Sequence, residues 1–190
     1  MRIFVFSIFL SIMTTGLVLS QPDRIGAGLA FANALDFNSG ETSNPGLFLK
    51  TWIALDRKSN FHIVPSVTAF NRYKFDPGAY ILKNYMFHGD IDGQYVFFRE
   101  RTVKVTGFGG ANFTYLKSTY EPLYANPYIT LSDADDWAIG GNIGAGLELR
   151  MTDHWDFNVS GKYKISKYAQ FVISVNAAYY FRGRGRSYRR

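Results

Sequence analysis

The chain has 190 residues and no cysteine, which fits one domain of ordinary size and excludes disulfides and thiolate metal sites. Its formal net charge of +6 comes from Arg2 and from five arginines after Phe181, so the rest of the chain is electrically balanced. Nucleic acid is therefore not an expected partner, because its recognition would need a basic face on the folded body.

Residues 1–20 have the composition of a secretory signal peptide. Arg2 provides a positive start, residues 3–19 are nearly all apolar, and Ser20 places a small residue before a polar stretch. We expect cleavage after Ser20 and export of the mature chain, with an uncleaved membrane anchor as the alternative. Beyond this segment, no apolar run approaches the roughly 18 residues that a spanning helix needs.

The remaining chain alternates apolar and polar side chains in eight segments, which is the pattern of two-faced β-strands. The expected strands comprise residues 25–35, 46–55, 61–73, 85–98, 103–115, 137–150, 155–163 and 170–181. Pro65 lies within the third of these, and we expect a local irregularity there because proline removes a ladder hydrogen bond. The high aromatic content of 17% and the 18 glycines are typical of β-barrels with aromatic girdles.

The connections between these strands alternate in length. Those after the first, third and fifth strands are long, and those after the second, fourth and sixth are short. Barrels of the outer membrane combine short periplasmic turns with longer external loops, and strands of about ten residues suit a tilted crossing. Trp137 and Trp155 lie on the apolar face at opposite ends of their strands, as expected for membrane-interface aromatics.

At this point residues 25–181 resemble the small eight-stranded outer-membrane β-barrels of Gram-negative bacteria, the OmpA/OmpX-like group. The resemblance is carried by residues 142–150, by Thr152 and Asp153, and by the terminal strand ending in residues 179–181. It implies an all-β, eight-stranded antiparallel up-and-down transmembrane barrel in the cell outer membrane. It also implies that Phe181 helps the insertion machinery to recognise the last strand, although a basic tail follows here. The expected division is a signal peptide (1–20), a barrel (21–181) and a tail (182–190).

The polar faces of the strands would fill the barrel interior, because eight strands enclose only enough space for side chains. The residues expected to form this interior polar network are Lys50, His88, Asp90, Asp92, Lys104, Glu148, Arg150 and Lys162. Their charges nearly balance, and buried charges must be paired, so we expect salt bridges that close the lumen.

Two alternatives compete with a non-enzymatic envelope protein. His88, Asp90 and Asp92 share one strand face, which would suit an outer-membrane hydrolase with a histidine base and a carboxylate that orients it. No Gly-x-Ser-x-Gly motif accompanies them, so we predict no catalytic residue, metal ligand or cofactor. A secreted lipocalin-like ligand-binding barrel would require the opposite orientation, with apolar residues inside.

The longest predicted loop, residues 116–136, is the best candidate for binding a partner, because loops on rigid scaffolds often carry function. Its aromatic and acidic candidates are Tyr120, Tyr124, Tyr128, Asp133, Asp135 and Asp136. A solvated loop without a partner is the competing interpretation. The expected partners are outer-membrane lipid (lipopolysaccharide and phospholipid) and envelope proteins bound by this loop or the arginine tail. The protein is predicted to be a structural or interaction component of the cell envelope. This prediction includes a role as a subunit of a larger outer-membrane complex.

Overall fold

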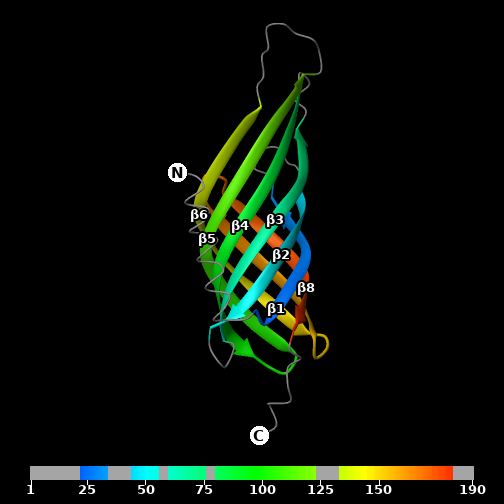
Figure 1. Cartoon of the computed structure of the whole chain (residues 1–190), viewed down its shortest axis with the longest axis vertical. Helices are drawn as coiled ribbons and strands as arrows, with labels where there is room; N and C mark the ends of the chain where they lie inside the picture. The colour runs from blue at the N-terminus through cyan, green and yellow to red at the C-terminus, as the bar shows by residue number, and fades with distance from the viewer. Residues whose placement is uncertain (1–21, 34–43, 56–59, 76–79, 123–132, 182–190) are drawn as a thin grey trace.

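Eight antiparallel strands form a closed barrel in the computed structural model, which describes residues 22–33, 44–55, 60–75, 80–122 and 133–181 (Figure 1). In chain order they are β1 (Arg24–Ala32), β2 (Asn44–Ala54), β3 (Phe61–Phe75), β4 (Tyr80–Arg99), β5 (Val103–Pro122), β6 (Ala134–Arg150), β7 (Trp155–Ile165) and β8 (Gln170–Tyr180). Each strand pairs with the next, and β8 returns to pair with β1. The predicted architecture is confirmed, whereas the predicted signal peptide and tail lie outside the described residues.

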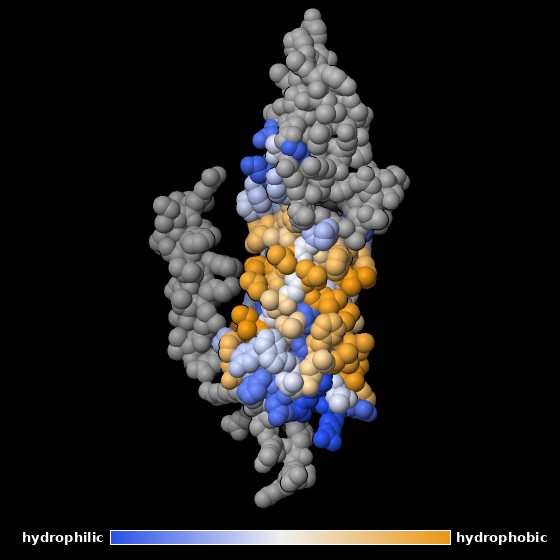
Figure 2. All heavy atoms as spheres, turned by 90° about the vertical axis from the view of Figure 1, so that its right-hand side faces the viewer, coloured by the Kyte–Doolittle hydropathy of each residue, from blue (hydrophilic) through white to orange (hydrophobic). Residues whose placement is uncertain are grey.

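The exterior of the barrel is apolar, whereas the interior holds the buried charged and polar side chains and a smaller apolar cluster that includes Phe48, Met86 and Leu116. Ile143 and Ile173 are 62% and 46% exposed, whereas Asp90 and Lys104 are 5% and 8% exposed. On the face of the barrel that Figure 2 shows, apolar residues form a belt across the middle, with hydrophilic residues above and below it. This orientation contradicts the lipocalin-like alternative. No segment of the described chain forms a helix long and apolar enough to cross a membrane.

The barrel is taller on one side. Arg24 of β1 pairs with Tyr180 of β8, so the start of β1 and the end of β8 lie at one end of the barrel, which we call the terminal end; the opposite end is the far end. β4 and β5 have 20 residues each and β6 has 17, whereas β1 has 9 and β2, β7 and β8 have 11. The long strands therefore continue past their neighbours at the far end (Figure 1).

This extension corrects the predicted loops. Residues 116–122 continue β5 and residues 134–136 begin β6, so only 123–133 connect the two strands. The predicted long loop after the third strand likewise shortens to 76–79, because β3 and β4 extend toward it. The connections after β1 (33–43) and β5 (123–133) are long and those after β2, β4 and β6 are short, as expected, so only the connection after β3 departs from the predicted alternation.

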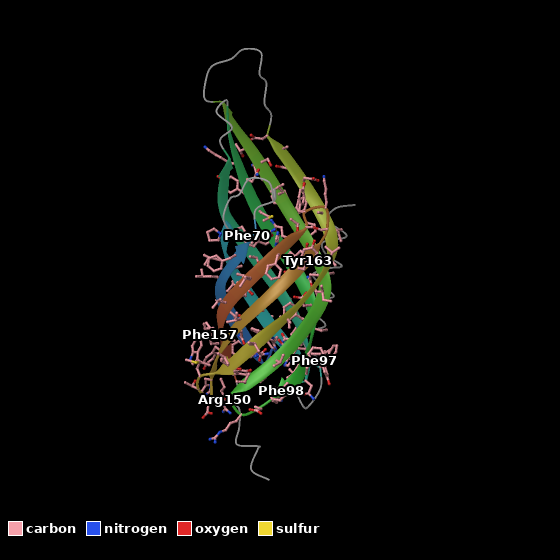
Figure 3. The ribbon with its side chains drawn as sticks, turned by 180° about the vertical axis from the view of Figure 1, so that it is seen from behind. Phe70, Phe97, Phe98, Arg150, Phe157 and Tyr163 are labelled. Carbon is pink, nitrogen blue, oxygen red and sulfur yellow. The ribbon has the colours of Figure 1, made fainter. Side chains whose placement is uncertain are left out.

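The strand pairing is irregular in three places. Pairing of β2 with β3 stops at Lys50–Ser66 and resumes at Ile53–Ile63, so Pro65 interrupts the ladder without shifting the register. The register shifts are elsewhere, between residues 70 and 73 of β3 and between 96 and 98 of β4. The second shift lets two successive residues, Phe97 and Phe98, both face outward near the terminal end (Figure 3).

Close packing between β1 and β8 requires a glycine at residue 28. A Cβ placed on Gly28 would lie 2.0 Å from the carbonyl oxygen of Val175, whereas a Cβ on Gly89 would meet no atom within 4 Å. We expect Gly28→Ala to lower the free energy of unfolding by about 1–3 kcal/mol, because the backbone must move apart. The control Gly89→Ala should change it by less than about 1 kcal/mol. Urea-induced unfolding from lipid bilayers measures both, and equal stabilities would contradict the close approach.

Candidate functional site

The polar interior begins near the terminal end with the carboxylate of Glu148 on β6. Its two oxygens accept hydrogen bonds from the Arg24 guanidinium at 2.7 and 2.8 Å. The same carboxylate accepts hydrogen bonds from Lys104 at 3.0 Å and from the side-chain amide of Gln94 at 2.9 Å. One buried anion thus joins side chains from β1, β4 and β5.

Tyr180 and Asp156 complete this group. The Tyr180 hydroxyl donates to Asp156 at 2.7 Å and accepts from Arg24 at 2.8 Å. Arg24 is fully buried and lies 4.2 Å from the centroid of the Trp52 ring, a cation–π contact. We call the seven residues the Glu148 cluster; they are Arg24, Trp52, Gln94, Lys104, Glu148, Asp156 and Tyr180. Their contacts cross the barrel interior and join every strand except β3.

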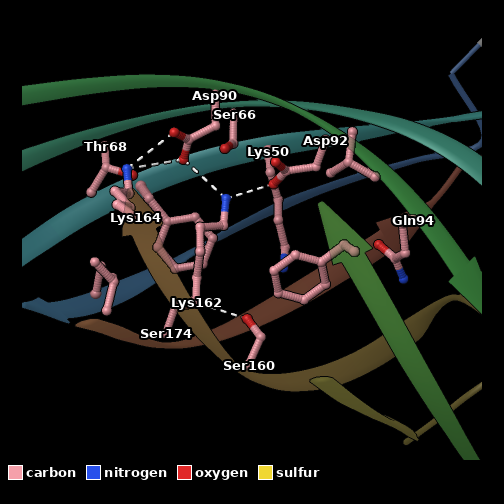
Figure 4. Close-up of a pocket in the computed structure, with 15 residues that line it drawn as sticks. Lys50, Ser66, Thr68, Asp90, Asp92, Gln94, Ser160, Lys162, Lys164 and Ser174 are labelled. Carbon is pink, nitrogen blue, oxygen red and sulfur yellow. Dashed lines mark hydrogen bonds and ion pairs between the residues drawn. The ribbon is translucent and has the colours of Figure 1, made fainter. Parts of the chain in front are cut away.

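A second group lies farther along the barrel axis, around Asp90 of β4 (Figure 4). Asp90 accepts hydrogen bonds from Lys162 and Lys164 of β7, each at 3.0 Å, and from Asn112 of β5. Lys162 also pairs with Asp92 at 2.5 Å. We call this group the Asp90 cluster; it comprises His88, Asp90, Asp92, Asn112, Lys162 and Lys164.

The proposed base and its orienting carboxylate do not contact each other. His88 is 1% exposed, and its Nδ1 accepts a hydrogen bond from Lys164, which lies between it and Asp90. Asp90 is itself occupied by two lysines and an asparagine. This arrangement provides neither an oriented base nor access for a substrate, so it gives no support to a hydrolase site. In the described part of the chain, no three His, Cys, Asp or Glu side chains are grouped to hold a metal ion.

Arg150 departs from the predicted network. It is the last residue of β6, its side chain is 30% exposed, and it pairs with the exposed Asp153 of the following turn at 2.5 Å. Figure 3 places it at the terminal end of the barrel. The alternation of inward and outward side chains ends there because the chain bends into the turn.

The sequence-based prediction does not include two cations of the barrel interior, Arg24 and Lys164. The predicted first strand begins after Arg24 and the predicted seventh strand ends before Lys164, whereas both residues belong to strands of the structure. Both continue the inward face of their strands, two residues before Gly26 and two residues after Lys162. Extending the alternation of inward and outward residues by one inward position, at the start of the first strand and at the end of the seventh, would identify Arg24 and Lys164.

A small cavity of about 50 Å³ lies beside the Asp90 cluster. Its polar lining includes Lys50, Ser66, Asp92, Ser160, Lys162 and Ser174 (Figure 4). Lys50 contacts the rings of Phe48 and Trp52, at 5.4 and 4.7 Å from their centroids, and makes no ion pair within the described chain.

The candidates at the far end do not form one loop. Tyr120 belongs to β5, Asp135 and Asp136 belong to β6, and Asp133 is exposed just before β6. Tyr124 and Tyr128 lie outside the described residues. Hydrogen bonds from Lys167 and Tyr168 of the β7–β8 connection lower the pKa of Asp136 to about 2. Asp136 therefore ties that connection to the edge of β6.

The two predicted interface tryptophans are on the outer surface near opposite ends of the apolar belt. Trp137 is 59% exposed and packs on Tyr115 and Phe113, with ring centroids 4.4 and 4.8 Å away. Trp155 is 47% exposed and packs on Tyr179 at 5.1 Å.

A closed barrel with an apolar exterior and a charged interior is the architecture of small outer-membrane β-barrels. Ail, the attachment invasion locus protein of Yersinia pestis, shares this fold with a TM-score of 0.58 and 14% identity, over 83% of this chain and 95% of Ail. Neisserial surface protein A has a TM-score of 0.59 and 14% identity, over 83% and 95% of the two chains. The N-terminal barrel domain of Pseudomonas aeruginosa OprF has a TM-score of 0.58 and 10% identity, over 84% and 98%.

These comparisons confirm, at the level of the fold, the resemblance to small eight-stranded outer-membrane barrels. No protein-family model matches the sequence, and no curated protein is detectably similar to it.

Proposed function

We propose that this chain is a non-enzymatic outer-membrane protein that displays a sheet at the cell surface for binding another envelope or surface macromolecule. The observation that carries the proposal is the one-sided continuation of the sheet past the apolar belt. We call it the outer extension and define it as residues 71–75, 80–84, 116–122 and 134–136. The Glu148 cluster supports a binding role over a transport role, because its buried side chains and their contacts cross the barrel interior.

The location follows from the lipid-facing belt and the signal-peptide-like residues 1–20. In outer-membrane barrels the short turns face the periplasm and the longer connections face outward. By this rule the terminal end, with its short turns at 100–102 and 151–154, faces the periplasm. The outer extension would then stand outside the cell, and lipopolysaccharide and phospholipid would surround the belt. The basic tail would start on the periplasmic side, where arginines attract anionic headgroups or a partner protein.

The outer extension has the properties of a recognition surface. Lys117 of β5 pairs across strands with Asp135 of β6, and both are exposed. β6 pairs with β7 only from Gly141 onward, so residues 134–140 have β5 as their single partner strand. The β7–β8 connection contacts this edge at Asp136, so the open part of the edge is at Ala134 and Asp135. An exposed strand edge can add a strand from another chain, and the charge of Asp135 would limit unspecific pairing there. By pairing with a strand of another chain at this edge, the extension would become part of a larger outer-membrane complex.

Site-specific crosslinking in intact cells tests this proposal. A benzoylphenylalanine placed at Lys117 or Asp135 should give a light-dependent adduct of defined mass. The matched control is Asp153, an exposed acidic residue in the turn at the terminal end, which should not give that adduct. If Lys117 and Asp135 form no adduct in cells that fold and export the protein, the binding role is wrong. Identical adducts at all three positions would also contradict it.

A further inference from the structure

We propose that the cavity inside the barrel binds a small monovalent anion of halide size, held by the ammonium group of Lys50. This inference is independent of the role of the outer extension, since it concerns a site enclosed by the barrel wall. It rests on three observations: a cation without an anionic partner, an excess of one positive charge, and an adjoining cavity lined by hydroxyl groups.

Lys50 lies on the inward face of β2, between Phe48 and Trp52. Its ammonium group contacts these two rings, and no carboxylate of the described chain forms an ion pair with it. Removing an ammonium ion from water costs several kcal/mol, whereas a cation–π contact returns only about 0.5–2 kcal/mol. A buried lysine in this position is therefore either neutral or balanced by a further negative partner, and an anion in the cavity would hold it in its charged form.

The charges of the two clusters show where that partner is needed. In the Glu148 cluster, the cations Arg24 and Lys104 face the anions Glu148 and Asp156, at 2.7 to 3.8 Å. In the Asp90 cluster, Lys162 and Lys164 already neutralise the two aspartates. Lys50 is thus the one cation left over among the charged residues of the clusters and the cavity wall. A monovalent anion would balance it, whereas a divalent anion would leave a net negative charge in a buried site.

The cavity offers hydrogen-bond donors of suitable size and kind. Ser66 and Thr68 line it, and their hydroxyl groups make no hydrogen bond within the described chain. Ser160 and Ser174 also line it and are joined by one 2.7 Å hydrogen bond, which leaves one of their two hydroxyl protons free to donate. The volume of about 50 Å³ accommodates a few water-sized groups, since one water needs about 10–15 Å³ by the same measure.

One neighbouring group restricts where the anion can lie. Asp92 borders the cavity, and its Oδ1 atom has no hydrogen-bond partner in the described chain. This oxygen would repel an anion, so the ligand should lie on the side of the cavity away from Asp92, against the ammonium group of Lys50.

Bromide is the probe for this site because it is halide-sized and scatters X-rays anomalously. Crystals of the full barrel soaked in sodium bromide should show an anomalous peak within hydrogen-bond distance of Lys50 Nζ. A peak at surface positions only, or no peak, overturns the proposal. In solution, the unfolding temperature should be higher in sodium chloride or bromide than in sodium gluconate of equal ionic strength, because gluconate is too large for the cavity.

Two variants separate the site from a general salt effect. Lys50→Met should abolish the difference between halide and gluconate, while Lys167→Met, at an exposed lysine, should keep it. Ser66→Ala should weaken halide binding several-fold without abolishing it. A halide effect that persists in Lys50→Met overturns the proposal. If Lys50→Met does not fold, the presence or absence of the bromide peak beside Lys50 in the wild-type protein tests the proposal by itself.

Discussion

Replacing Glu148 with alanine is expected to lower the free energy of unfolding by about 3–5 kcal/mol, because it leaves two buried cations without their main partner. Arg24 is 0% exposed and Lys104 is 8% exposed, and both donate to this carboxylate at 3.0 Å or less. Asp156 lies 3.7 and 3.8 Å from the same two cations and offsets part of the loss.

The matched control is Arg150→Ala, two residues further along the same strand. Arg150 also makes an ion pair, but with the exposed Asp153, so its removal should change the unfolding free energy by less than about 1 kcal/mol. Urea-induced unfolding from phospholipid bilayers, followed by tryptophan fluorescence, gives both values on one scale. Glu148→Ala and Arg150→Ala of equal stability would show that the interior cations are hydrated and that the Glu148 cluster does not close the lumen.

The comparison of these two residues also shows what the sequence could predict. Alternation with a period of two identified the inward face of every strand, because lipid on one side and a polar interior on the other impose opposite demands. It could not show that Arg150, on the same face as Glu148, lies where the strand ends and the chain turns. It also could not show which cation meets which anion. Arg24 and Glu148 are 124 residues apart, and their contact depends on the strand tilt and register of the closed barrel.

The sequence-based prediction does not include the outer extension, for a related reason. Residues 117–122 show no regular alternation of apolar and polar side chains, so the pattern that marks a strand in the sequence ends there. Residues 116–122 are polar enough to suggest a loop, yet β5 continues through them by pairing with β4 up to Tyr80–Pro122. Backbone pairing with neighbouring strands, which composition does not report, determines the length of these strands.

Replacing Ile143 with arginine is expected to lower the free energy of unfolding by about 2–4 kcal/mol in a bilayer, because the charge would enter the lipid-facing belt. Ile143 is 62% exposed on β6, and its neighbours across the strands are Gly109 and Tyr163, neither of which carries a charge. Ile143→Leu keeps the apolar surface and should leave the stability within about 1.5 kcal/mol of the original.

Ile165→Arg provides a control for depth in the membrane. Ile165 is 58% exposed, but it is the last residue of β7, close to the connection that contacts Asp136 at the far end. An arginine there can reach the interface, so a cost of about 0–1 kcal/mol is expected. Because an exposed isoleucine in water tolerates replacement by arginine, a neutral effect at both positions would mean that the belt faces water. A large cost at Ile143 alone is the result that only a hydrocarbon environment at mid-height produces.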